Sequence, residues 1–390
     1  MTAPTRVTAR FASALSEHPV TAHAVGEAAG HVLERVGPRP DLVTLFVTPA
    51  HAGALEDAAA AVRAVLEPSV LVGCAAVSVL GDGREVEEGP AVAVWAGRTG
   101  PTVPVRLGVT STPEGPAVTG WPAEPGFEPR ALLLVADPFS FPAEALFAGL
   151  ARRHPGLPVL GGNASAARGP GGNRLALDDG VHTDGAVGAL LGPGVDMTAV
   201  VSQGCRPIGQ PYTVTRAEHN VVYELGNQPA YQRLVETCRT GLSEEELALV
   251  NRGLHLGLVI DEHKTDFGRG DFLVRNVMGA DPENGAIGVN DIVEVGTTVQ
   301  YHVRDAATAD EDLRTLLAGR EAEGALVFTC NGRGVRLFGR PHHDAQVVEE
   351  LLYPAASCGF FAAGEFGPVG GRNFVHGFTA SVALLTAAPG

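Results

Sequence analysis

One pattern recurs three times along the chain: an apolar strand, a helix, a short second strand and a glycine-rich segment that leads into a final strand. The distance from the first strand to the glycine is nearly constant, at 31 positions for Leu42 to Gly73, 29 for Leu132 to Gly161 and 33 for Leu326 to Gly359. A near-constant spacing indicates internal repeats. The sequence therefore predicts an α+β fold of internally repeated β-α-β-hairpin units, which form mixed sheets with flanking helices in two lobes.

The elements of each repeat follow from periodicity and turn residues. The first repeat is predicted to have strands at 41–48, 70–72 and 91–96, a helix at 54–66 and a hairpin turn at Gly81-Asp82-Gly83. The second has strands at 131–136, 158–160 and 186–191 and a helix at 142–153. The third has a strand at 325–329, a helix at 344–352 and a glycine-rich hairpin at 359–385. Asp344 is expected to be the N-cap of the last helix.

Three further segments lie outside the repeats. An apolar residue every fourth position predicts an amphipathic helix at 19–36, as an N-terminal addition. Dense Pro and Gly between 97 and 129 predict a long irregular connection. Short strands with helices at 230–240 and 244–250 fill the region from 198 to 304, and we place a boundary near 223–227, with domains at 1–225 and 226–390.

The charge balance restricts the partners of this protein. Lys and Arg number 28 against 44 Asp and Glu, for a net charge of -16. An acidic surface repels phosphate, so neither nucleic acid nor a membrane surface is an expected partner. Five scattered cysteines without a CxxC pair, and no apolar run long enough to span a membrane, predict a cytoplasmic protein.

Glycine-rich loops and acidic clusters could hold a nucleotide or a metal. The loops GGNASAARGPGGN and GPVGGRN have no Lys-Ser or Lys-Thr after them and open onto no helix, so no nucleotide cofactor is predicted. The clusters PHHDA at 341–345 and DEHKTD at 261–266 contain possible metal ligands. Adjacent residues of a strand point to opposite faces, so His342 and His343 would not share an ion, and no metal site is predicted.

Cys330, Cys358 and His376 are the residues from which a nucleophilic site could be built. The chain has neither a GxSxG elbow nor a known cysteine-enzyme signature, and Cys358 begins an apolar strand where buried thiols are inert. No catalytic residue is assigned, and a binding protein is favoured over an enzyme.

A group of polar residues stands in glycine-rich and apolar surroundings near the C-terminus. Such groups are costly to bury unpaired, so they must pair with each other or with a ligand. Two interpretations stay open, an internal Glu-Arg lock and the lining of a pocket. Strand alternation places His376 on the face of Phe374 and Phe378, which favours a core position for it. The candidate ligand-binding residues are Asn331, Arg333, Glu365, Arg372, Asn373 and His376.

The segments that carry these residues, VFTCNGRGVRLFG and CGFFAAGEFGPVGGRNFVHGFTASVALL, resemble the FIST family, named for F-box and intracellular signal transduction proteins. The sharpest motifs lie at 329–334, 364–371 and 374–381. The first half of the chain is similar to the FIST N-terminal domain and the second half to the FIST C-terminal domain. The resemblance implies a role in sensing small ligands, amino acids among them, beside a signalling output.

The family's usual output domains do not accompany the FIST-like pair in this sequence. The hypothesis is therefore a cytoplasmic, non-enzymatic sensor of a small, amino-acid-like ligand that works with a separately encoded signalling protein. In it, Arg333 or Arg372 binds a ligand carboxylate and Glu365 binds an ammonium group. Two alternatives remain: a protein-interaction module whose loop at 99–129 docks a partner, and an enzyme that depends on Cys330 or Cys358.

Overall fold

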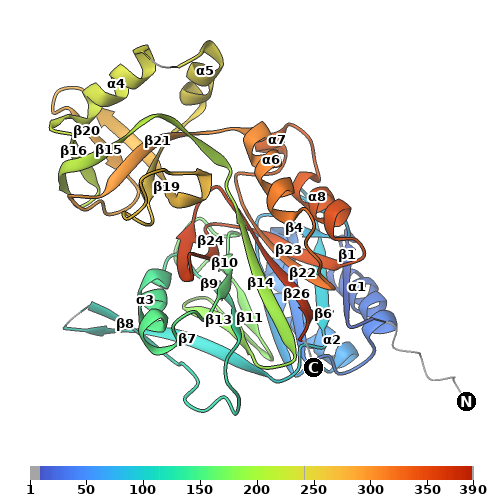
Figure 1. Cartoon of the computed structure of the whole chain (residues 1–390). Helices are drawn as coiled ribbons and strands as arrows, with labels where there is room; N and C mark the ends of the chain where they lie inside the picture. The colour runs from blue at the N-terminus through green and yellow to red at the C-terminus, as the bar shows by residue number, and fades with distance from the viewer. Residues whose placement is uncertain (1–8, 114, 241, 389–390) are drawn as a thin grey trace, which may run out of the picture. The chain divides into compact units, whose positions relative to one another are not determined.

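The computed structural model describes residues 9–113, 115–240 and 242–388 (Figure 1). Its contacts group the chain into two compact units, and each is built from segments that are discontinuous in sequence. Unit 1 consists of Met1–Val201, Arg314–Val375 and Thr379–Gly390, and unit 2 of Ser202–Leu313 and His376–Phe378. The division into 1–225 and 226–390 concerns sequence domains rather than these contact units, and it stays a prediction.

Unit 1 contains the three predicted repeats, here called copies 1, 2 and 3. Copy 1 consists of β2 (Leu42–Val47), α2 (Leu55–Leu66), β3 (Val70–Ala75), the hairpin β4 (Val79–Gly81) and β5 (Arg84–Val86), and β6 (Val92–Gly97). Copy 2 consists of β9 (Ala131–Ala136), α3 (Ala143–Arg153), β10 (Val159–Asn163), the hairpin β11 (Leu175–Leu177) and β12 (Gly180–His182), and β13 (Ala186–Leu191). Copy 3 consists of β22 (Gly324–Cys330), α8 (His343–Leu352), β23 (Ala356–Ala362), the hairpin β24 (Glu365–Val369) and β25 (Arg372–His376), and β26 (Ala380–Ala387).

The hairpin of each copy is part of the sheet of another copy. In each of the three sheets of unit 1 the first and second strands of a copy are parallel, and the last strand pairs antiparallel with the first. On its other side, the second strand of each copy pairs with the hairpin of another copy. β11–β12 of copy 2 lies beside β3, β24–β25 of copy 3 beside β10, and β4–β5 of copy 1 beside β23. The exchange is therefore cyclic and ties the three copies into one unit.

An additional strand completes the opposite side of each sheet. These strands are β1 (Phe11–Ser16) beside β6, β7 (Thr102–Thr112) with β8 (Gly115–Thr119) beside β13, and β14 (Val195–Ser202) beside β26. The hairpin β7–β8 lies where an irregular connection was predicted, so that prediction is wrong. Val103, Val105 and Leu107 share one face of β7, which pairs with β13, and this apolar alternation outweighs the nearby Pro and Gly residues.

The recurring glycine of each copy has one structural cause. Gly73, Gly161 and Gly359 lie in the second strand of their copies, opposite Leu45, Leu134 and Val327 of the first strand. A Cβ atom at these glycines would come within 2.1, 1.8 and 1.7 Å of the carbonyl oxygens of those three partners. Only glycine allows this approach of backbone to backbone, so the spacing noted in the sequence reflects packing.

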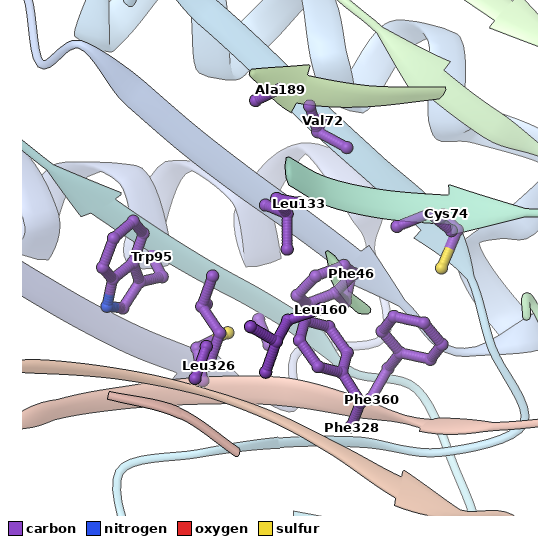
Figure 2. Close-up of a cluster of buried hydrophobic side chains, with 14 of the residues drawn as sticks. Phe46, Val72, Cys74, Trp95, Leu133, Leu160, Ala189, Leu326, Phe328 and Phe360 are labelled. Carbon is purple, nitrogen blue, oxygen red and sulfur yellow. The ribbon is translucent and has the colours of Figure 1, made fainter. Parts of the chain in front are cut away.

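The inner faces of the three sheets form the core of unit 1. Phe46 of β2 packs against Phe360 of β23 with ring centroids 4.9 Å apart, and Leu133 of β9 belongs to the same buried cluster (Figure 2). Helices cover the outer faces: α1 (Thr21–Val36) and α2 on the sheet of copy 1, and α3 on that of copy 2. The predicted helix at 19–36 and the predicted α+β fold of repeats are both confirmed.

Unit 2 is an antiparallel sheet that closes on itself. Its strands follow the order β15, β21, β18, β19, β20, β16, and β15 also pairs with β16, which closes a barrel. Their bounds are β15 (Cys205–Glu218), β16 (Val221–Leu225), β17 (Gln228–Pro229), β18 (Leu254–Val259), β19 (Phe272–Asp281), β20 (Ala286–Val289) and β21 (Thr298–Arg304). Leu256, Tyr301 and Val303 help to fill the interior, and α4 (Ala230–Thr240) and α5 (Glu244–Arg252) lie beside the barrel (Figure 1).

The strand alternation predicted for Phe374, His376 and Phe378 is interrupted after His376. β25 ends at His376, and Phe378 has a φ of 67°, in the left-handed region that a strand cannot contain. The ring of Phe378 lies 4.3 Å from that of His255 in unit 2. Within the described part of the chain, no helix has both the length and the apolar character needed to cross a membrane.

Candidate functional site

The turn that follows β22 places Arg333 inside unit 1. The backbone N–H of Arg333 donates to the carbonyl oxygen of Cys330 at 2.8 Å, which closes the turn, and Gly334 has a positive φ of 67°. The glycines on both sides of Arg333 permit this tight path. As a result the Arg333 side chain points inward, and the residue as a whole is only 1% exposed.

Arg333 pairs with Asp344 at the start of α8. Arg333 Nε donates to Asp344 Oδ2 at 2.7 Å, and Nη2 donates to Oδ1 at 2.8 Å. Both side chains are 0% exposed. Thr329 Oγ1 donates to Oδ2 at 2.5 Å, and His343 Nδ1 lies 2.9 Å from Oδ1. Two parallel hydrogen bonds to a planar guanidinium make this a strong and directional pair.

The environment of Asp344 keeps its carboxylate ionised. Burial by itself would raise the pKa of Asp344, but the charge and hydrogen bonds of Arg333 outweigh burial and hold that pKa well below its usual range. The prediction that Asp344 is the N-cap of α8 is wrong. His342 occupies the cap position with a φ of 65°, and the Asp344 side chain is engaged by Arg333 instead.

Glu365, the first residue of β24, is the second buried ionisable group. Its Oε2 accepts from the Thr379 backbone N–H at 3.1 Å and from Thr379 Oγ1 at 2.8 Å. The side chain is fully buried. Burial raises the pKa of Glu365 to about 8, although Thr379 and the positive charge of Arg333 act in the opposite direction. The carboxyl group is therefore mostly neutral at pH 7.

Arg333 and Glu365 each have one atom with open hydrogen-bonding capacity. Arg333 Nη1 and Glu365 Oε1 are buried, and the described residues offer neither atom a hydrogen-bond partner. We call them the open atoms, and we call Arg333, Asp344, Thr329, Glu365 and Thr379 together the polar centre. Leaving such groups buried and unpaired costs about 1–3 kcal/mol each, so an occupant that pairs with both would stabilise the protein.

Glu85, which the sequence did not single out, also reaches α8. It comes from β5, the hairpin that copy 1 lends to the sheet of copy 3. Its Oε1 accepts from the backbone N–H of Ala345 at 3.0 Å, and its own backbone N–H donates to His342 Nδ1 at 2.9 Å. Burial and the neighbouring charge of Asp344 raise the pKa of Glu85 to about 7. Only the hairpin exchange brings this residue to a helix some 260 positions later.

The structure separates the six predicted site residues into groups. Arg333 and Glu365 are close enough to interact electrostatically in the polar centre. The exposed Asn331 lies in the same turn as Arg333, and its backbone N–H donates to Ala362 O at 2.8 Å. Their role in ligand binding stays a prediction.

The other three predicted residues lie on β25. Arg372 is exposed, with its guanidinium 5.3 Å from the ring centre of Phe374. Asn373 has a structural role, since its amide donates to Leu157 O at 2.8 Å and accepts from Val159 N–H at 2.9 Å. His376 is buried, and its contacts group it with unit 2.

The structure also informs the cysteine and metal alternatives. Cys358 is fully buried, and burial raises the pKa of its thiol far above the usual range, so it stays protonated. In DEHKTD, Asp261 accepts from the His263 N–H, and Glu262 accepts from Thr298. Among the residues with described positions, His, Cys, Asp and Glu form no group of three that could hold a metal ion.

Comparison with known proteins covers nearly the whole chain. The FIST N domain matches residues 41–228, and the FIST C domain matches residues 229–368. An uncharacterized protein of Mycobacterium tuberculosis is 46% identical over 383 residues, which cover 96% of this chain and 99% of the relative. An uncharacterized protein of Mycobacterium bovis is 45% identical over 375 residues, which cover 94% of this chain and 96% of that relative.

Proposed function

The chain belongs to the FIST family, and from that premise we propose that it is a cytoplasmic sensory protein that binds a small ligand at the polar centre. Domains of this family are associated with sensory signal transduction and ligand binding. The observation that supports this site is that Arg333 Nη1 and Glu365 Oε1 are buried and have no hydrogen-bond partner among the described residues. The signal then passes to a separately encoded protein.

The location of the polar centre favours a binding role. Arg333 and Glu365 both follow the carboxyl ends of parallel strands, since Arg333 comes after β22 and Glu365 comes after β23. In sheets with parallel strands, ligands commonly bind beyond these carboxyl ends. Asn331, exposed in the same turn, stands where a small ligand would first meet the protein. An amino acid or a related metabolite has polar groups of the kind that pair with such atoms.

A thermal-shift screen tests the proposal. A ligand present at 100 times its Kd stabilises the folded protein by about 2.7 kcal/mol, which raises Tm by a few degrees. We expect a shift with amino acids or with fractions of a metabolite extract. Arg333→Lys should abolish it, because lysine keeps the charge opposite Asp344 but lacks the guanidinium fork.

Arg372→Ala serves as the matched control for Arg333→Lys. Arg372 is exposed on β25 and stacks only on Phe374 in the described contacts, so its loss should leave the ligand shift unchanged. Equal shifts in all three proteins would place the ligand elsewhere. No shift with any fraction would contradict the sensory proposal itself.

One observation favours a second function, protein interaction through the hairpin β7–β8. β8 ends the strand order of its sheet, so in the described structure one of its edges is free of a strand partner. A free edge can accept an extended peptide as an added strand. Pull-down of a stoichiometric partner by the native protein, lost when Val118 is replaced by Pro, would support this function.

A further inference from the structure

The hydrogen-bond pattern around Glu365 favours one of its two oxygens as the site of the proton. Thr379 donates two hydrogen bonds to Oε2, from its backbone N–H and from Oγ1. An oxygen that accepts two hydrogen bonds uses both of its lone pairs. The proton of the neutral acid therefore belongs on Oε1. Oε1, one of the two open atoms, is then an O–H donor.

Arg333 offers donors of the same kind. Its Nε and Nη2 are used by Asp344, so the N–H groups of Nη1 are those left over. Arginine has no acceptor and keeps its charge at every ordinary pH. Both open atoms therefore carry a donor while Glu365 is neutral, and an acceptor that meets both would satisfy them.

The charged groups near Glu365 do not change this conclusion. Arg333 faces it from the turn after β22 and Cys330 lies at the end of that strand, while Asp344 on α8 is already neutralised by Arg333. Thr379 before β26, the backbone N–H of Gly364 and Gly162 on β10 also lie beside Glu365, and none of them carries a charge. An acceptor with negative charge is the occupant that this arrangement favours.

We propose, building on the ligand site proposed above, that the ligand presents a carboxylate to Glu365 Oε1–H and Arg333 Nη1–H, and that binding requires the proton on Glu365. This reverses the earlier expectation that Glu365 binds an ammonium group as an anion. A carboxylate brought to an ionised Glu365 would meet a like charge without a proton between the two. Binding and protonation are therefore linked.

The linkage gives a measurable pH dependence. Burial raises the pKa of Glu365 to about 8, so raising the pH from 6.5 to 9.0 should weaken carboxylate binding about ten-fold. In Glu365→Gln the amide oxygen can accept from Thr379 and the amide NH2 takes the place of Oε1–H. That variant should bind with an affinity that does not change between the two pH values.

The experiment compares matched probes at constant ionic strength. Acetate and glycine are titrated against acetamide and glycinamide, with the shift in Tm measured at pH 6.5 and at pH 9.0 for the wild type, Glu365→Gln and Arg372→Ala. We expect the two carboxylates, but not the amides, to raise Tm, with the weakening at pH 9.0 seen in the wild type and in Arg372→Ala only.

Each other outcome overturns the inference in a distinct way. Equal binding of amides and carboxylates would reject the carboxylate while leaving a small-ligand site in place. A carboxylate affinity in the wild type that is independent of pH would reject the role of the proton. A response to none of the four probes would reject the inference, and the metabolite screen then decides separately whether the sensory proposal fails with it.

Discussion

Arg333 and Asp344, eleven residues apart in sequence, form a two-point ion pair between Nε and Oδ2 at 2.7 Å and between Nη2 and Oδ1 at 2.8 Å, with both side chains wholly buried. The pair joins the turn after β22 to the first turn of α8. It leaves Nη1 of Arg333 directed away from Asp344, which is why the polar centre has a donor to offer.

Removing one member of this pair should be costly. Asp344→Ala leaves the Arg333 charge buried without a counter-ion, which typically destabilises a protein by about 3–5 kcal/mol. Glu350→Ala is the matched control, since it breaks the exposed Arg314–Glu350 pair and should cost less than about 1 kcal/mol. Urea unfolding measures both. A similar small loss in the two variants would show that the buried pair is dispensable.

Because β22 and β23 approach closely at Gly359, a side chain at this position should destabilise the protein. Gly359→Ala places a Cβ 1.7 Å from Val327 O, so the strands must separate, at a cost of about 1–3 kcal/mol or more. Gly149, in α3 with open space around it, is the opposite case, and Gly149→Ala should stabilise the protein by about 0.4–1 kcal/mol. Thermal unfolding of the two variants should move in opposite directions, and shifts of the same sign would refute the account of the recurring glycine.

Glu365 should make the protein less stable as the pH rises. Its pKa is about 8 in the folded protein against an ordinary value of 4.5, so between these values the folded state holds a proton that the unfolded state has lost. The contribution of Glu365 to the free energy of unfolding is fully present below pH 4.5. It decreases by up to about 1.4 kcal/mol per pH unit as the pH rises to 8, and it is lost above that pH. Glu365→Gln should remove this slope. Urea unfolding at pH 5, 7 and 9 checks it, and parallel profiles for the variant and the wild type would contradict the raised pKa.

Two histidines of unit 2 should stay neutral in mild acid. His255 and His302 face each other on β18 and β21, and burial lowers the pKa of each to about 4. For a base with a lowered pKa, stability falls as the pH drops below the unfolded value of 6.5 toward 4. The imidazole C–H signals in NMR spectra should therefore not move between pH 8 and pH 5. Titration of either ring near pH 6.5 would show that it is not desolvated.

The sequence allowed the repeats to be predicted because the recurring glycines mark a backbone contact that only glycine permits. The exchange of hairpins could not be predicted, since a short hairpin pairs equally well with its own copy or with a neighbouring one, and the choice depends on packing. Glu85 was missed for this reason. Arg333 and Glu365 stood out as charges in apolar surroundings, but their partners Asp344 and Thr379 depend on the path of two turns, which spacing does not reveal.

The central claim is that a small ligand occupies the space between Arg333 Nη1 and Glu365 Oε1. The most direct measurement is a high-resolution crystal structure of the protein grown with the strongest stabiliser found in the metabolite screen, with inspection of the electron density at the open atoms. We predict density for a ligand whose acceptor group lies within hydrogen-bond distance of both atoms. A direct hydrogen bond between Arg333 and Glu365, or a single water molecule there with the ligand bound elsewhere, would contradict the claim and show that the polar centre is a structural lock.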